Sequence, residues 1–196
     1  TTTLDLSLSK GSMDSLRGHP AINMRNNRLY LSKGYQYAAN GPTRATSSHK
    51  QSKALAQLHT TGIKTRRGKI RALVKFVHEH LTYQTLPASF NLDDILSSRI
   101  GDCTEHALLL AEMLNSIGLP TRQISGLIYL GDSKQRFGGH VWVEVYYDGS
   151  WHAVDPTWNL TEVTATHIPL MIGAEKSPEV LTKARQLAFK LEKITY

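Results

Sequence analysis

The only cysteine of this 196-residue chain, Cys103, stands where a helix is predicted to begin. Asp102 is a typical N-cap residue and Glu105 follows three positions later, a pattern that predicts a capping box. Cys103 would then be the first helical residue, where unpaired backbone N–H groups and the positive end of the helix dipole favour a thiolate. A lone cysteine forms no disulfide within the chain and supplies too few thiolates for a structural zinc site. Cys103 is therefore either a thiol packed in the core or a nucleophile.

A base for such a nucleophile is available in a predicted strand that contains His140. Between residues 140 and 147, apolar positions alternate with His140, Trp142 and Glu144, which is the period of a half-buried strand. His140 and Trp142 are therefore expected to share one face of this strand. The alternative role for His140 is that of a structural histidine packed beside Trp142.

The Asp-Gly dipeptide at 148–149 predicts a two-residue type I′ turn after this strand. In that register Asp155 lies opposite Trp142 and diagonal to His140, at a Cα spacing of about 7–8 Å that two side chains can bridge. A three-residue loop would place Asp155 on the other face, so the register decides whether the acid can serve His140. The alternative role for Asp155 is that of a turn carboxylate before Pro156.

These three side chains can divide the chemistry of acyl transfer among them. Cys103 would attack a carbonyl carbon, His140 would move the proton, and Asp155 would hold the imidazole in the useful tautomer. The N–H of Cys103 can donate to the developing oxyanion, and a second donor is required. Three polar residues before the helix are candidates for that second donor: Tyr83, Gln84 and Asn91.

Two stretches of the chain resemble the core of the transglutaminase-like superfamily in its bacterial branch: GDCTEHALLLAEMLNSIGLPTRQISGLIY and GGHVWVEVYYDGSWHAVDPTWN. The resemblance covers residues 66–169, and ATHIPL at 165–170 is similar to a segment that follows the Asp in many bacterial members. It implies an α+β, papain-like fold in which the catalytic helix packs on an antiparallel sheet. It also implies Cys103 as nucleophile, His140 as base and Asp155 as orienting acid.

The superfamily includes crosslinking enzymes, proteases, deamidases and inactive relatives, so the resemblance leaves the acceptor open. We expect hydrolysis of a peptide or side-chain amide of a protein or peptide substrate through a Cys thioester, because water needs no dedicated second site. The alternatives are a protein-glutamine transamidase and a non-catalytic binding module of the same fold. Trp142 is the predicted substrate-binding residue because it lies between the proposed catalytic side chains. Glu144, on the same face, could bind an amine or form an ion pair with a neighbour, and Trp158 is expected in the core.

No cofactor and no metal is predicted. His106 lies one turn after Cys103 and could suggest a metal site together with His152 or His167. One Cys with scattered His residues lacks the paired spacing of known zinc motifs. The chain also has no acidic loop of the Asp-x-Asp-x-Asp-Gly type that binds calcium.

The positive charge of the chain is concentrated in its first part. Residues 1–80 hold fourteen Lys and Arg against three Asp and Glu, whereas the remaining residues hold nine against thirteen. Such asymmetry can mark a surface for an anionic partner such as nucleic acid, phospholipid or cell-wall polymer. The alternative is an ordinary solvated helix face, and no nucleic-acid-binding motif is present.

The composition, 40% hydrophobic and 20% charged, predicts a globular chain with a sizeable core. Residues 1–48 are predicted to be an irregular N-terminal extension, with 28–31 and 35–37 as possible short strands, and residues 49–196 a catalytic domain. Within the latter we expect helices over 52–59, 67–81, 103–117 and 178–194, a strand over 124–130, and a polar loop over 131–139 that could form a lid or rim.

No apolar run approaches the roughly 18 residues that span a bilayer, and no signal peptide opens the chain. Since the first residue is Thr1 and not Met, we expect a processed or excised product. The sequence therefore predicts a soluble protein of a bacterial cytoplasm, or of the periplasm or exterior.

Overall fold

The structure is a computed structural model that describes residues 3–10, 19, 22–25, 28–31, 37–38, 47–85, 91–131, 137–173 and 188–195. The chain forms two compact units. Unit 1 comprises Thr1–Tyr37, Ile124–Val141 and Val163–Tyr196, and unit 2 comprises Ala38–Gln123 and Trp142–Glu162. None of the helices in the described part of the chain has the length and apolar character that crossing a bilayer requires.

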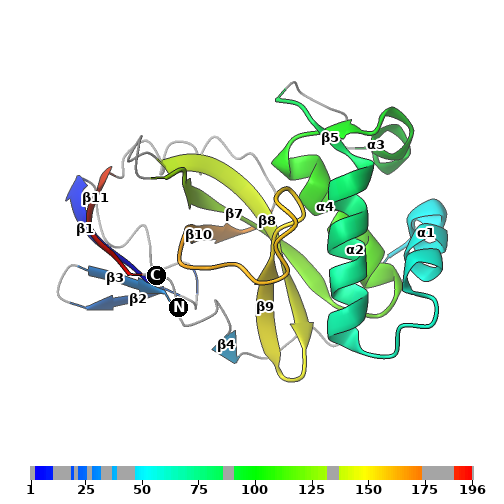
Figure 1. Cartoon of the computed structure of the whole chain (residues 1–196), viewed down its shortest axis with the longest axis horizontal. Helices are drawn as coiled ribbons and strands as arrows, with labels where there is room; N and C mark the ends of the chain where they lie inside the picture. Colours follow the sequence, from blue (N-terminus) through cyan, green and yellow to red (C-terminus); the bar gives the residue numbers. More distant parts are fainter. Residues whose placement is uncertain are drawn as a thin grey trace. The chain divides into compact units, whose positions relative to one another are not determined.

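The helices among the described residues belong to unit 2 and are α1 (Lys50–Thr60), α2 (Arg66–His80), α3 (Leu92–Ser98) and α4 (Cys103–Ser116). The predicted helices over 52–59, 67–81 and 103–117 are confirmed as α1, α2 and α4. Helix α4 contacts each of the other three (Figure 1). The short α3 was not predicted; Asn91 caps its start and Arg99, in the left-handed conformation, ends it.

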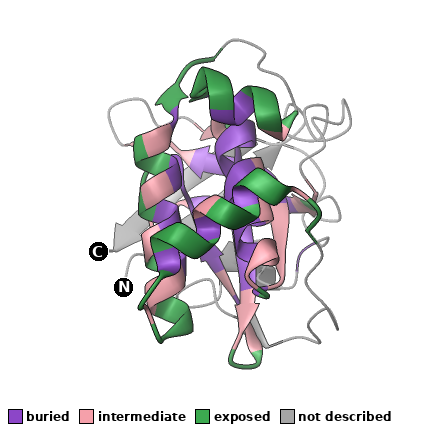
Figure 2. Ribbon diagram, turned by 90° about the vertical axis from the view of Figure 1, so that its right-hand side faces the viewer, coloured by how far each residue is buried: buried purple, intermediate pink, exposed green. Residues whose placement is uncertain are grey.

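The apolar faces of these helices form the core of unit 2. In α2 the buried residues recur at helical spacing, as the sequence predicted, and are Ile70, Leu73, Val74 and Val77. Helix α4 is buried on most of its surface, whereas α1 and α2 keep an exposed side (Figure 2). Gly118 follows α4 with φ +82°, the left-handed conformation expected of a residue that stops a helix. A helix held in this way fixes the position of its first residue, Cys103.

Strands also pair within the described part of unit 2. Strands β5 (Thr82–Tyr83) and β6 (Ile100–Gly101) run parallel, and β6 leads directly into α4. Strand β9 (Ser150–Val154) pairs antiparallel with the end of β8 (Phe137–Tyr147), from Tyr147 opposite Ser150 to Val143 opposite Val154. Asp148 and Gly149 both have positive φ, 51° and 80°, as a type I′ turn requires. The two-residue turn is therefore confirmed, and so is the predicted register from Tyr147 to Val143.

Unit 1 contains two antiparallel strand arrangements. Strand β10 (His167–Ile172) pairs with β7 (Thr121–Tyr129), which confirms the strand predicted over 124–130. A four-stranded antiparallel sheet has the order β11 (Ala188–Thr195), β1 (Thr3–Lys10), β3 (Arg28–Leu31) and β2 (Ile22–Arg25). The short strand β4 covers Tyr37–Ala38. Helices and antiparallel strands together confirm the α+β class.

Three boundary predictions are corrected by these strands. Residues 188–194 form β11 and not the end of a helix, while 178–187 lie outside the described residues. Part of residues 1–48, predicted as irregular, forms β1, β2 and β3, and β3 matches the strand predicted over 28–31. Strand β8 begins at Phe137, within the predicted polar loop, of which 132–136 lie outside the description. Pairing of β11 with β1 supplies backbone hydrogen bonds from a partner far away in sequence, and this outweighs the local helical pattern.

Candidate active site

The start of α4 holds Cys103 as the sequence predicted. The Thr104 N–H donates to Asp102 Oδ1 at 2.8 Å, and the Asp102 N–H donates to Glu105 Oε2 at 2.7 Å, which completes a capping box. Cys103 is the first helical residue and is half-buried. Its own N–H finds no acceptor among the described residues, so this donor remains available to a ligand at the helix start.

Close packing between Gly101 and Glu105 supports this helix start. A Cβ added at Gly101 would lie 2.5 Å from the Cβ of Glu105, so no side chain fits there. Glu105 is 1% exposed, and its second oxygen, Oε1, has no hydrogen-bond partner in the described part of the chain. Burial raises the pKa of Glu105, and the neighbouring Asp102 side chain raises it further. The capping box is therefore a buried structure that depends on a glycine at position 101.

Strand β5 brings one candidate oxyanion donor beside the start of α4. The Gln84 N–H donates to the Gly101 carbonyl at 3.1 Å, and the Gln84 side chain is exposed. Tyr83 lies 6.3 Å from the ring of His106, measured between ring centroids. Asn91 instead caps α3, where its Oδ1 accepts the Asp93 N–H at 2.9 Å. Of the three candidates, Gln84 combines an exposed side-chain amide with a backbone hydrogen bond to the residue before the α4 cap.

His106 supports the turn that precedes Cys103. Its Nδ1–H donates to the Asp102 carbonyl at 2.7 Å, and the residue is 1% exposed. Burial lowers the pKa of His106, so the neutral imidazole is favoured. In the described part of the chain, neither Cys103 nor His106 belongs to a group of three potential metal ligands. His106 is therefore a structural partner of the helix cap.

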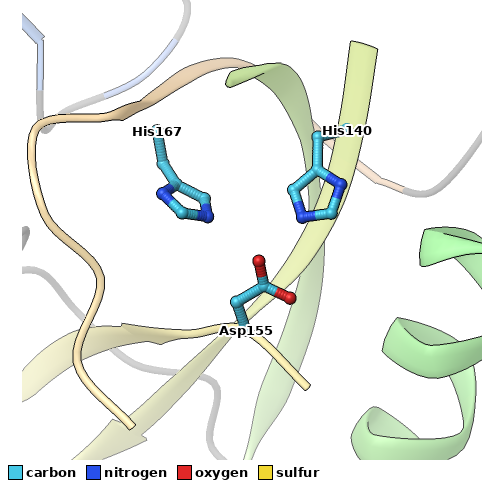
Figure 3. A group of neighbouring side chains, drawn as sticks. All are labelled: His140, Asp155 and His167. Carbon is cyan, nitrogen blue, oxygen red and sulfur yellow. The ribbon is translucent and has the colours of Figure 1, made fainter. Parts of the chain in front are cut away.

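His140 lies in β8 and is 6% exposed. Its ring meets that of His167, at the start of β10, with centroids 5.7 Å apart and planes inclined at 61° (Figure 3). Both histidines belong to unit 1. The sequence considered His167 only as a metal ligand, because nothing in the local pattern shows that β10 would bring it to His140.

Asp155 directly follows β9 in unit 2, as drawn in Figure 3, and is completely buried. Its Oδ1 accepts the Thr157 N–H at 2.8 Å, and its backbone exchanges two hydrogen bonds of 2.8 Å with Leu160. Hydrogen bonds of this kind are needed to hold a carboxylate away from water. The predicted turn carboxylate is thus present, and its rigid position also suits an acid that orients a base.

The sequence also singled out Trp142, Glu144 and Trp158 in this region. Trp142 is completely buried, so it has no exposed surface for the substrate contact predicted for it. Glu144 is also completely buried and forms an ion pair with Arg122, with Nε and Oε2 2.7 Å apart. The Arg122 guanidinium also lies 4.0 Å over the ring of Trp151. Trp158, expected in the core, is 43% exposed.

A cavity of about 600 Å³ in unit 2 collects part of the positive charge noted in the sequence. Its basic lining residues are Lys64, Arg66, Arg67 and Lys69, accompanied by the acidic Asp148. Arg66 pairs with Asp148 at 2.7 Å, whereas neither lysine forms an ion pair with any described residue. The cavity therefore keeps a net positive charge.

Comparison with known sequences finds matches to one protein superfamily. The sequence profile of the transglutaminase-like superfamily matches residues 53–156, more than half of the chain. The chain is 29% identical over 101 residues to the kyphoscoliosis peptidase of Homo sapiens, and 28% identical over 109 residues to that of Mus musculus. These matches cover 46% and 50% of this chain but 15% and 16% of the two relatives, so the chain spans about a sixth of their length.

Similarity to a solved structure concerns the fold. A candidate cysteine protease from Cytophaga hutchinsonii superimposes with a TM-score of 0.55 at 17% sequence identity. The match covers 80% of this chain and 51% of that protein. Such low identity transfers the architecture alone, which is the papain-like transglutaminase fold expected from the sequence.

Proposed function

Because the chain belongs to the transglutaminase-like superfamily, we propose that it is a thiol-dependent acyl-transfer enzyme that cleaves a peptide or side-chain amide. The observation that carries this proposal is the placement of Cys103 as the first residue of a capped, buried helix with its N–H unpaired among the described residues. A thiolate is the reactive form of a cysteine, and this position favours negative charge.

The register of the β8–β9 hairpin supports a pairing of His140 with Asp155. Val143 is opposite Val154, so continuing this register one residue beyond the end of β9 would bring Asp155 towards Trp142. His140 precedes Trp142 by two residues in β8 and therefore shares its face. The register thus supports a diagonal pairing of base and acid, and we assign proton transfer to His140 and orientation of its ring to Asp155.

The proposed reaction has two steps, the acylation of Cys103 and the hydrolysis of the resulting thioester. His140 takes the thiol proton while Cys103 attacks the amide carbon, and the oxyanion accepts hydrogen bonds from the Cys103 N–H and the Gln84 side chain. The protonated His140 then gives its proton to the leaving nitrogen, which departs as the C–N bond breaks and leaves a thioester. Water attacks the thioester and His140 accepts one of its protons; that proton returns to the departing sulfur as the carboxylic acid is released.

Mass spectrometry of Cys103 tests the covalent step. The protein is exposed to a glutamine-containing peptide, quenched in acid, and analysed for a thioester adduct beside Cys103→Ala. We expect an adduct in the wild type that hydroxylamine removes, and none in the variant. A non-catalytic binding module of the same fold would give no adduct and only slow labelling of Cys103 by iodoacetamide at pH 6, where an ordinary thiol is almost unreactive.

The acceptor of the acyl group distinguishes the two enzymatic alternatives, hydrolysis by water and transamidation by an amine. We favour water because the acidic residue considered as an amine-binding group, Glu144, is paired with Arg122 and buried. Incubation with the glutamine peptide and a fluorescent primary amine separates the outcomes. Ammonia release without incorporation of the amine supports hydrolysis, whereas incorporation of the amine supports transamidation.

The basic cavity supports a further proposal, that unit 2 binds an anionic ligand. Lys64 and Lys69 line it without an ion pair in the described part of the chain, so a bound anion would neutralise charges that are otherwise uncompensated. Titration calorimetry with inorganic phosphate tests this. The Lys64→Ala/Lys69→Ala variant should lose binding, while Lys75→Ala, which removes an exposed lysine paired with Glu79, should not. Equal effects of both variants would indicate a non-specific charge effect.

A further inference from the structure

His167 is a buried titratable residue to which the proposed reaction gives no role. It is completely buried at the first position of β10, opposite Ile128 of β7. Its backbone N–H donates to the Thr164 carbonyl at 3.2 Å, and its Nδ1 lies 3.1 Å from Thr166 Oγ1. Both the main chain and one ring nitrogen are therefore held by the turn that precedes β10.

The ring of His167 lies edge-on to the ring of His140, in the arrangement that aromatic pairs prefer (Figure 3). His140 is itself 6% exposed, so its ring is confined by protein more than by water. Because its contacts hold His167 in place, the His167 ring packs as a fixed neighbour of the His140 ring.

We infer that His167 is a positioning residue for His140 and that its ring fixes the orientation of the proposed base. This inference rests on the proposed function, since proton transfer by His140 is part of that proposal. A base must remain within hydrogen-bond reach of the proton that it takes, and a displacement of about 1 Å can cost about 100-fold in rate. The feature of His167 that matters for this role is a planar ring of similar size.

The test compares variants that keep or remove this ring. His167→Phe keeps an aromatic ring without ring nitrogens, and His167→Gln keeps a polar group without a ring. Leu170→Ala is the matched control, because Leu170 is 7% exposed in the same strand and its truncation also weakens the packing of β10. The readout is the rate of Cys103 labelling by iodoacetamide at pH 6 divided by the rate at pH 9, where an ordinary thiol is largely ionised. This ratio cancels general changes in the accessibility of the thiol.

We expect the ratio to fall about 10-fold or more in His167→Gln, to stay within about 3-fold of wild type in His167→Phe, and to be unchanged in Leu170→Ala. An unchanged ratio in His167→Gln, or an equal fall in His167→Phe or Leu170→Ala, would overturn the inference. His140→Ala is measured in parallel. If the ratio is unchanged in His140→Ala, the proposed function fails; if it falls there but not in His167→Gln, only the role of His167 fails.

Discussion

Replacing Gly101 with alanine perturbs the start of α4 without touching Cys103. The new Cβ would lie 2.5 Å from Glu105 Cβ and 3.2 Å from Glu105 Cγ. The first of these atoms is fixed to the helix backbone, so a rotamer change of Glu105 cannot relieve the contact. The helix start must shift, and the two capping bonds, at 2.7 and 2.8 Å, are the interactions that the shift disturbs.

The expected cost follows from these contacts. Two hydrogen bonds at about 1 kcal/mol each and an overpacking cost of about 1–3 kcal/mol oppose a gain of about 0.4–1 kcal/mol from the stiffer unfolded chain. The free energy of unfolding of Gly101→Ala should therefore fall by about 2–5 kcal/mol. Cys103 labelling by iodoacetamide at pH 6 should slow as well, since the capped helix start no longer holds the thiol.

Urea unfolding followed by circular dichroism measures the first effect. Gly139→Ala is the matched control, because an added Cβ there meets no atom within 4 Å and its backbone is not left-handed. The control should leave the free energy of unfolding unchanged or raise it slightly. A Gly101→Ala variant with wild-type stability and wild-type labelling would refute the argument that the capping box positions Cys103.

Three further predictions concern other parts of the structure. Arg122→Met should lower the free energy of unfolding by about 3–5 kcal/mol, because it removes the ion-pair partner of the buried Glu144 carboxylate. Urea unfolding of Arg122→Met/Glu144→Leu should show most of that stability restored; a double variant as unstable as the single one would count against the ion-pair argument. Burial lowers the pKa of His106 below 6.5, so just below that pH the unfolded chain binds more protons than the folded protein. The free energy of unfolding should therefore fall as the pH decreases from about 6.5 to the pKa of His106 in the folded protein. His106→Asn should flatten this part of the stability profile, and an unaltered profile would contradict the assignment. Finally, the proposed reaction uses no metal, so amide cleavage should survive dialysis against EDTA; a loss that zinc restores would contradict the mechanism.

The features that the sequence predicted correctly depend on neighbours within a few residues. The capping box joins Asp102 to Glu105, and the turn at 148–149 sets the register by backbone conformation alone. Apolar periodicity likewise located α2 and α4, because a helix face of that width must be buried. These local signals were sufficient to place Cys103 at a helix start and Asp155 directly after β9.

The features that the sequence did not predict depend on distant partners. Residues 188–194 have a helical pattern, yet β11 pairs with β1 from the opposite end of the chain. The contact between His140 and His167 similarly arises from the placement of β10 beside β7. The complete burial of Trp142 also could not be predicted from the alternation of apolar and polar residues. That alternation shows which side of a strand a residue faces, but not what covers that side.

Cys103, His140 and Asp155 are proposed to act as one unit. The most direct test of this proposal is the rate of Cys103 labelling by iodoacetamide at pH 6 in the wild type, His140→Ala, Asp155→Ala and the double variant. Residues that act together have non-additive effects, so each single variant should label much more slowly than wild type, and the double variant no more slowly than His140→Ala. Wild-type rates in either single variant, or effects that simply add in the double variant, would contradict the account.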